Sequence, residues 1–151
     1  MLGISRRTDY AARIVLHLAC LPEGNQVSIR QISAQRLLPM PFVRRLIAEL
    51  VSAGLLRTTR GSNGGVCLAR PAAEISLLEL VNAMEGGIVI NHCVDDPKAC
   101  PLAAFCPVQN AWTGATRSLE GYLESVNFKD LAQGTAGHLD AHRGSHALHQ
   151  T

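Results

Sequence analysis

The sequence predicts a mainly helical fold with one small β-hairpin, and three observations support this. Hydrophobic residues recur at helical spacing in four separate stretches. Two Ser-x-x-Gln/Glu motifs, at residues 28–31 and 76–79, are typical of helix N-termini. A glycine-rich turn at residues 60–65 separates two short apolar runs, which is the pattern of a hairpin. Since 47% of the 151 residues are hydrophobic, a core of ordinary size is expected.

A first helix is expected to begin near Ser5 and to end at the turn in residues 22–25. Its apolar residues recur at helical spacing: Tyr10, Ile14, Leu18 and Leu21. A short second helix follows, from about Ser28, which begins the first capping motif, to Arg36.

A third helix is expected between Pro39, which stops the second helix, and Gly54, which suits a C-terminal cap. Pro41 fits its first turn. Its buried stripe is predicted to be Val43, Leu46, Ile47 and Leu50. The hairpin strands follow at residues 55–59 and 66–69. Three helices followed by a hairpin is the winged helix-turn-helix plan, in which the third helix enters the major groove of DNA.

Basic residues are concentrated in the first half of the chain. Residues 1–70 contain ten arginines and three acidic residues, whereas residues 71–151 contain four basic and nine acidic residues. A basic half suits a polyanion, and arginine makes bidentate contacts with phosphate and guanine. A solvated basic face would give the same count, so charge alone does not decide between DNA binding and simple exposure.

The arginines expected to contact DNA lie on the third helix, the wing and the second helix. Arg44 and Arg45 fall opposite the buried stripe and near the helix N-terminus, the end that reaches base edges. Arg60 lies at the glycine-rich wing tip, and Arg57 and Arg30 are candidates for phosphate contacts.

Two further helices are expected after the wing. A fourth helix begins at the motif of Ser76 and ends at Gly86. A long helix covers about Val108 to Val126, and its apolar residues are spaced alternately four and three apart: Val108, Trp112, Ala115, Leu119, Tyr122 and Val126. This 3.5-residue seam favours a dimerisation helix. The alternative is a helix that packs on its own domain.

A loop between these two helices contains three of the five cysteines, Cys93, Cys100 and Cys106. Thiolates bind soft metals and iron–sulfur clusters, and the wide spacing is unlike that of a zinc finger. A cluster with four ligand positions would need one more ligand, for which the residues leave Asp9, His92, Gln109 or a second chain open. Cys20 and Cys67 are expected to be small core residues or inert thiols.

These elements divide the chain into four segments. We expect a DNA-binding domain in residues 1–87, a cluster-binding loop in 88–107, a dimerisation helix in 108–133 and a disordered tail in 134–151. The tail contains His138, His142, His146 and His149, which we interpret as chance spacing rather than a metal site. No signal peptide or membrane span is predicted, so we expect a cytoplasmic protein without disulfides.

The sequence resembles the IscR/NsrR family of iron–sulfur transcription regulators, also called the Rrf2 family. The resemblance covers about residues 2–132. It rests on residues 8–11 (TDYA), on residues 53–56 and 60–66 through the wing, on residues 75–77 and 85–86, and on the cysteine loop with its Cys100-Pro101-Leu102 sequence.

The resemblance implies a homodimer in which the long helix crosses between subunits and the three loop cysteines ligate the cluster. In the nitric-oxide-sensing branch an aspartate of the partner's first helix is the fourth ligand, and Asp9 matches it. In the cluster-biogenesis branch the fourth ligand is a histidine, and Gln109 stands in its place. This ligand set favours a [4Fe–4S] over a [2Fe–2S] cluster. Arg60 matches the arginine that such regulators place in the minor groove.

The sequence departs from the family pattern at two places. Val66 stands where tyrosine is common, and prolines flank Met40 where small polar residues usually begin the recognition helix. Because those polar residues often touch DNA, the second departure leaves the target sequence open. For Asp9 the alternative role is a surface ion pair with Arg13, one helical turn on.

The predicted function is a dimeric regulator that binds a palindromic operator and senses redox state, nitric oxide or iron status. It is not expected to be an enzyme, because no nucleophile–base pair is found and the glycines at residues 61–65 lie in a hairpin rather than a nucleotide-binding loop. A cluster-free thiol-based regulator and an iron–sulfur electron carrier are the alternatives. The sequence does not distinguish a repressor from an activator.

Overall fold

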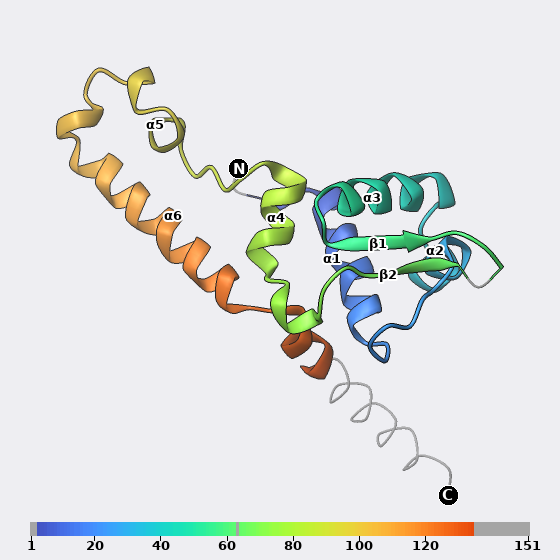
Figure 1. The fold of residues 1–151 in the computed structure, drawn as a ribbon. Coiled ribbons are helices and arrows are strands. Elements are labelled where there is room, and N and C mark those ends of the chain that lie inside the picture. Colours follow the sequence, from blue (N-terminus) through green and yellow to red (C-terminus); the bar gives the residue numbers. More distant parts are fainter. Residues whose placement is uncertain (1–2, 63, 135–151) are drawn as a thin grey trace, which may run out of the picture.

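The structure, a computed structural model, describes residues 3–62 and 64–134 (Figure 1). The elements in chain order are α1 (Arg6–Ala19), α2 (Ile29–Arg36), α3 (Met40–Ser52), β1 (Leu56–Thr59), β2 (Gly65–Leu68), η1 (Ala72–Glu74), α4 (Leu77–Glu85), α5 (His92–Asp95), η2 (Pro97–Ala99), η3 (Ala103–Phe105) and α6 (Pro107–Ser125). Helical backbone resumes at residue 128 and continues to residue 134. The predicted fold class, mainly helical with a hairpin wing, is confirmed.

Serine side chains begin three of the helices. The hydroxyl of Ser5 accepts the backbone N–H of Thr8 at the start of α1. Ser28 and Gln31 form the complete capping box that the sequence predicts for α2. At α4 the box is only half present: Ser76 accepts the N–H of Glu79, but the Glu79 carboxylate bonds to Arg70 instead of reaching back. The ion pair with Arg70 therefore replaces the second half of that cap.

Helices α1, α3 and α4 and the hairpin enclose one aliphatic core. The four residues predicted for the α3 stripe are all buried: Val43, Leu46, Ile47 and Leu50. The hairpin is antiparallel, with Leu56 opposite Leu68 and Thr58 opposite Val66, and both Leu56 and Val66 are buried. One face of the wing thus packs on the helices, and the other carries the exposed side chains of Arg57 and Thr59.

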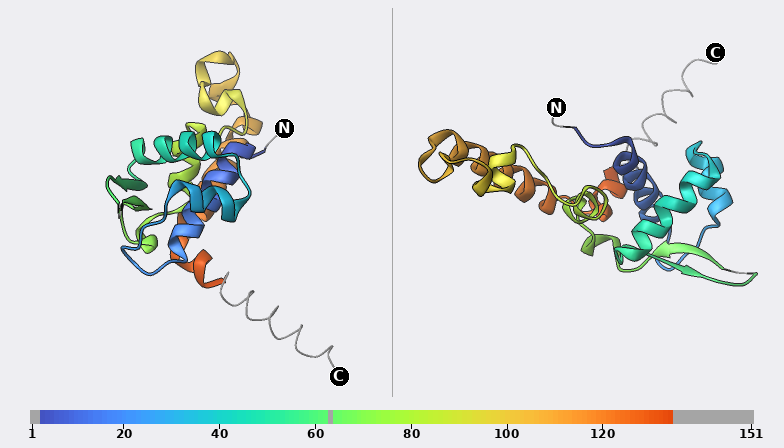
Figure 2. Two further views of the ribbon diagram at one scale, coloured as in Figure 1. Left: turned by 90° about the vertical axis from the view of Figure 1, so that its right-hand side faces the viewer. Right: turned by 90° about the horizontal axis from the view of Figure 1, so that it is seen from above.

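The cysteine loop and α6 extend away from this core as an arm (Figures 1 and 2). We call residues 88–125 the arm and residues 3–87 with 126–134 the body. The arm returns to the body where Val126 accepts the N–H of Leu77 at 2.8 Å and Phe128 donates its N–H to Ile75 at 3.1 Å. The Phe128 side chain is buried in the core of the body.

Two features differ from the predicted segments. The long helix ends at Ser125, and Val126 and Asn127 interrupt the helical backbone, so residues 108–133 form two helical pieces rather than one. The short turns α5, η2 and η3 within the cysteine loop were not predicted. The histidine-rich tail lies outside the described residues, except for Gly134. Within residues 3–62 and 64–134, no helix is long and apolar enough to cross a membrane.

Candidate nucleic-acid interface and cysteine loop

Helix α3 separates a buried face from a basic, exposed one. Arg44 and Arg45 are both exposed, on the side opposite the four buried residues. The guanidinium of Arg44 lies 3.5 Å from the sulfur of Met40, one turn earlier. The helix begins at Pro39, which provides no side-chain cap and accepts backbone N–H bonds from Phe42 and Val43 through its carbonyl. The first turn of α3 therefore presents apolar groups, and its cations come one turn later.

The other predicted DNA contacts lie on the wing and on α2. Arg60 is exposed next to Gly61, whose φ of +114° only glycine adopts readily. A Cβ at Gly64 would lie 2.3 Å from the carbonyl oxygen of Thr59, so the hairpin closes tightly behind Arg60. Arg30 is exposed in the first turn of α2.

Arg57 is the exception among these arginines, because it is engaged with the wing itself. Its Nε donates to the sulfur of Cys67 at 3.1 Å, on the face of the hairpin turned away from the core. Cys67 is buried under this contact, in line with its predicted structural role. Cys20, by contrast, is exposed and is not a core residue.

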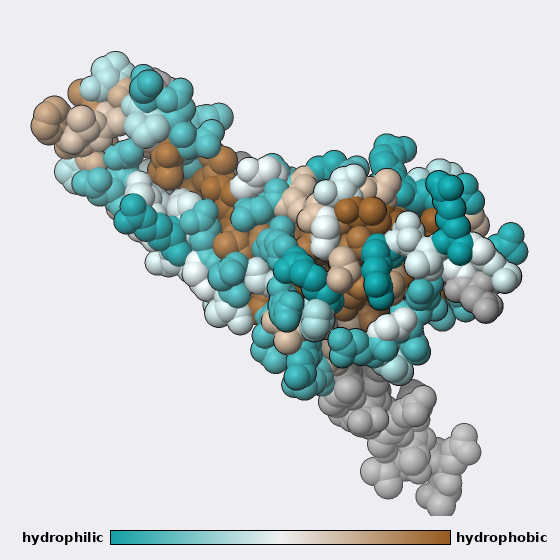
Figure 3. All heavy atoms as spheres, in the orientation of Figure 1, coloured by the Kyte–Doolittle hydropathy of each residue, from teal (hydrophilic) through white to brown (hydrophobic). Residues whose placement is uncertain are grey.

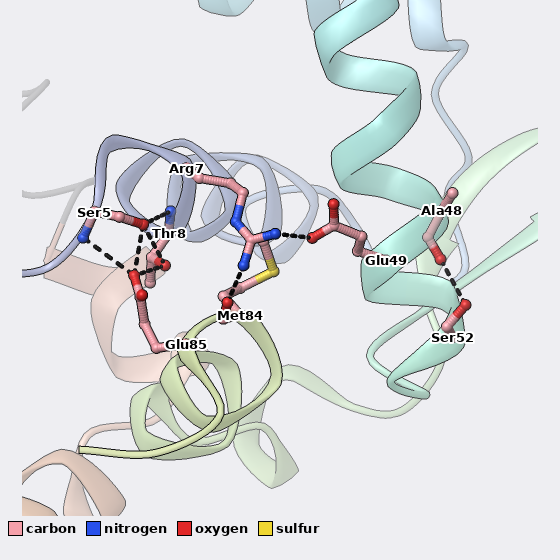
Figure 4. Close-up of polar contacts among 8 residues, drawn as sticks. All are labelled: Ser5, Arg7, Thr8, Ala48, Glu49, Ser52, Met84 and Glu85. Carbon is pink, nitrogen blue, oxygen red and sulfur yellow. Dashed lines mark hydrogen bonds and ion pairs between the residues drawn. The ribbon is translucent and has the colours of Figure 1, made fainter. Parts of the chain in front are cut away.

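A polar network joins the start of α1 to the end of α4 and to α3 (Figure 4). The Glu85 carboxylate accepts the backbone N–H of Ser5 at 3.1 Å and the hydroxyls of Ser5 and Thr8. Arg7 lies between α4 and α3, where it donates to the carbonyl of Met84 and to Glu49 at 3.0 Å. The hydroxyl of Ser5, followed by that of Thr8, lowers the pKa of Glu85.

This network connects the cysteine loop to the predicted recognition helix. Glu85 is the last residue of α4, directly before Gly86 and Gly87, from which the chain leaves for the arm. Sequence reasoning missed the network because its partners are 42 to 80 residues apart. An acidic residue next to the Gly-Gly pair was the only available signal.

The three loop cysteines lie at the ends of its short turns. Cys93 is in α5, Cys100 follows η2, and Cys106 stands at the N-cap position of α6 without a side-chain cap, and all three are half-buried free thiols. The amide nitrogen of Gln109 donates to the carbonyl of Cys93 at 3.1 Å, which ties the first turn of α6 to α5. In the described part of the chain, no three His, Cys, Asp or Glu side chains converge as a metal site.

Asp9 lies on α1, away from its own cysteine loop, and pairs with Arg13 at 2.9 Å. The Arg13 guanidinium stands 5.7 Å from the centre of the Tyr10 ring. The Tyr10 ring meets Phe42 edge-on at 5.7 Å, in the first turn of α3. Asp9 is thus connected to the start of α3 through two side chains.

The profile of the Rrf2 family, described as an iron-dependent transcriptional regulator, matches residues 4–134. The chain belongs to the Rrf2 family. Protein aau3 of Rhizobium meliloti is 30% identical over 132 residues, which cover 86% of this chain and 84% of that relative. The transcriptional regulator NsrR of Oceanobacillus iheyensis is 27% identical over 131 residues, covering 86% and 89%.

Solved structures of Rrf2 regulators share the fold. CymR, the global cysteine regulator of B. subtilis, superimposes with a TM-score of 0.73 at 25% identity, covering 88% of this chain and 98% of CymR. IscR of T. potens gives a TM-score of 0.71 at 25% identity, with 89% and 88% covered. The protein is therefore an Rrf2 transcriptional regulator with a DNA-binding winged helix, and it is not an enzyme.

Proposed function

We propose that the protein acts as a homodimer that binds a palindromic operator through one α3 from each protomer. The observation that carries this proposal is the division of α3 into a buried stripe and an exposed face with Arg44 and Arg45. These two arginines would contact base edges or phosphates in the major groove. Arg60 would enter the minor groove, and Arg30 would bind a phosphate. Arg57 uses Nε on Cys67, so we assign it a phosphate contact through its other nitrogens.

The exposed seam of α6 supports the homodimer. Of its nineteen residues, all within the described chain, only Thr116 is buried. Val108, Trp112 and Tyr122 are 58%, 40% and 66% exposed, and apolar side chains appear along the arm in Figure 3. A second copy of α6 would bury this seam, which has the 3.5-residue spacing of paired helices. The flank beside the seam, with Thr116 buried and Leu123 half-buried, is turned toward the protein's own chain.

We propose that Cys93, Cys100 and Cys106 of one protomer and Asp9 of its partner hold an iron–sulfur cluster, a [4Fe–4S] rather than a [2Fe–2S] cluster. The donor set fits, because three thiolates on one short loop suit iron and leave one position open. The side-chain amide of Gln109, which stands at the alternative ligand position, is already engaged as a donor to the Cys93 carbonyl. Asp9 is half exposed, and its surface pair with Arg13 contributes only about 0.3–0.5 kcal/mol, so exchanging that pair for another partner costs little.

When bound, such a cluster would link the cysteine loop of one protomer to α1 of its partner. Nitric oxide, oxygen or iron loss would break this link. The protein's own contacts would carry the change to DNA. The loop begins next to Glu85, which binds the start of α1, and Arg7 continues from α4 to Glu49 on α3. A shift of the loop or of α1 would thereby reposition α3. A coupling of about 1–3 kcal/mol, or about 5–150-fold in affinity, would suffice for regulation.

The second candidate is a cluster-free thiol regulator on the same scaffold. It is favoured by the free thiols of the loop and by the similarity to CymR of Staphylococcus aureus in its oxidized form, which has a TM-score of 0.66 at 26% identity. In this case the loop cysteines would be oxidised and reduced reversibly, and the same network would carry the signal.

Anaerobic purification of the full chain distinguishes the two candidates. The cluster proposal expects visible absorbance, bound iron and sulfide, and loss of all three in Cys93→Ser, Cys100→Ser and Cys106→Ser, with Cys20→Ser unchanged. Asp9→Ala should lose iron faster than the wild type, whereas Asp95→Ala in the loop should not. Colourless protein whose DNA affinity follows reversible thiol oxidation would favour the thiol regulator. Absence of sequence-specific DNA binding in either state would contradict the proposed function itself.

A further inference from the structure

The turn between α2 and α3 holds a leucine in an unfavourable setting. Leu37 has φ +53° and ψ +42°, and it is the one non-glycine residue with positive φ in the described chain. Its side chain is 90% exposed. A residue with a Cβ is destabilised in the left-handed region, and an exposed leucine gains nothing from burial. Both features are unfavourable for the free protein.

The backbone conformation itself has a clear cause. The carbonyl of Ser33 accepts the N–H groups of Leu37 and Leu38, and the Ser33 hydroxyl donates to the carbonyl of Leu38 at 2.6 Å. These bonds turn Leu38 toward the core, where it packs partly buried, and leave the Leu37 side chain outside. The turn therefore requires the left-handed conformation but not a leucine, since glycine or asparagine adopts it with less strain.

The neighbours of Leu37 extend its apolar surface along the start of α3. Pro39 and Pro41 are exposed and Met40 is half-buried. Neither proline has a backbone N–H, and Pro39 provides no polar cap. We call Leu37, Pro39, Met40 and Pro41 the apolar tip. Hydrogen bonding to base edges from the tip is therefore largely excluded, although it lies at the end of the helix that such folds direct at bases.

Charges beside the apolar tip identify its partner. Arg44 and Arg45 follow within the next turn of α3, and both are exposed. An apolar surface bordered by arginines is complementary to the major groove, where phosphates flank the bases. The only apolar group on a base edge in that groove is the 5-methyl group of thymine.

We propose that the apolar tip reads thymine methyl groups in the operator and that Leu37 is a specificity-determining residue. This proposal rests on the proposed function, because it requires α3 in the major groove. Each operator half-site would then have thymines under the tip, next to the bases or phosphates contacted by Arg44 and Arg45. Reading by methyl contact also explains how a recognition helix can begin with two prolines.

The test removes the methyl groups from the DNA without changing the protein. A binding duplex is first selected with the full-length protein from a random pool of unmethylated DNA, so that thymine is the only source of 5-methyl groups. Each thymine of the half-site is then replaced by deoxyuridine. We expect about fourfold weaker binding for each contacted thymine, the loss that corresponds to one buried methyl group. Equal affinity at every substituted position would overturn the proposal.

A second experiment uses variants of Leu37. Leu37→Asn and Leu37→Gly suit the left-handed backbone, so their melting temperatures should equal or exceed that of the wild type. Both should bind the selected duplex more weakly and should lose the difference between thymine and deoxyuridine. Leu37→Met keeps an apolar side chain and should retain that difference. A thymine preference that survives unchanged in Leu37→Asn and Leu37→Gly would remove Leu37 from base reading.

A third measurement separates this inference from the proposed function. If Arg44→Ala weakens specific binding while deoxyuridine and the Leu37 variants have no effect, α3 reads DNA and the apolar tip does not. If the wild-type protein selects no sequence at all, the proposed function and the inference fail together.

Discussion

The body and the arm differ in how much of their structure one chain stabilises. In the body, Ile14, Leu46, Leu80 and other aliphatic residues are fully buried around one core. In the arm, Ala103 and Thr116 are the buried residues of the described chain, and Phe105, Leu102 and Tyr122 remain 92%, 72% and 66% exposed. The body thus has the packing of an independent domain, whereas the arm has apolar surface that its own chain does not cover.

From this difference we expect the arm to be the region that responds to a signal. A DNA-binding body with its own core would move as a unit, while an arm with uncovered apolar surface would respond to the presence of a partner or a cofactor, as in the proposed function. Variants of the body and of the arm test this division between the two regions.

The largest effect is expected at Phe128, where the arm returns to the body. Its side chain is 1% exposed, so Phe128→Ala should lower the free energy of unfolding by about 3–5 kcal/mol. Phe105→Ala is the matched control, since the same side chain is 92% exposed in the arm and should change that free energy by less than about 0.5 kcal/mol. Urea denaturation followed by circular dichroism measures both. Equal effects would show that the division into body and arm is wrong.

A second prediction concerns the seam of α6. Trp112→Ala should weaken dimerisation by about 2 kcal/mol, or about 30-fold, because large aromatic residues dominate buried interfaces. Asn110→Ala is the control, because Asn110 is exposed on the same helix but outside the seam. Sedimentation equilibrium gives both dissociation constants. A dimer unaffected by Trp112→Ala would place the interface elsewhere.

The third prediction concerns the body's basic face. Arg44→Ala and Arg45→Ala should each weaken specific DNA binding by about 1–3 kcal/mol and relax the preference at one base, if they contact bases. A residue that contacts only phosphate should instead weaken binding to all sequences and reduce its salt dependence. Titrations of specific and random duplexes at several salt concentrations separate these cases. Wild-type affinity in both variants would show that this face of α3 does not contact DNA.

The smallest effect is a pH dependence of the body. Burial, followed by the nearby charge of Arg36, lowers the pKa of His17, whose Nδ1 lies 2.8 Å from the Arg36 guanidinium. The unfolded chain therefore binds a proton at His17 at a pH where the folded chain does not. Stability should fall as the pH drops below about 6.5 and level off below the folded pKa. Denaturation at about pH 7.5 and about pH 5.5 should show this fall in the wild type, and less of it in His17→Gln.

The sequence predicted the body well because its signals are local. Ser28 with Gln31, Pro41 in a first turn and Gly54 after α3 each act within a few residues, and the structure has all three. The stripe of α3 follows from periodicity alone. Local signals fail where a residue outside the motif competes. Glu79 bonds to Arg70 instead of completing its predicted capping box. Phe128 packs in the core although it follows the arm.

The site could be predicted only in part. The exposed positions of Arg44, Arg45 and Arg60 follow from helical spacing and from the glycines of the wing. The role of Arg57 on Cys67 depends on strand register, which the sequence does not specify. In the proposed function, the approach of the loop cysteines to each other and to Asp9 would depend on a second chain and a cofactor, so neither spacing nor one folded chain would determine it.

The arm leaves the body after Glu85, at the C-terminal end of α4, and re-enters it beside the N-terminal end of the same helix. Ser76 and Asn127 form a β-bridge where the chain returns, and Leu77 and Phe128 bond on either side. Topologically the arm is an insertion in the body, since a linker long enough to run back along α4 could join its two ends. Doubling the length of such an insertion costs only about 0.6 kcal/mol of closure entropy. Evolution could therefore exchange the arm for another insertion while the same DNA-reading body is retained.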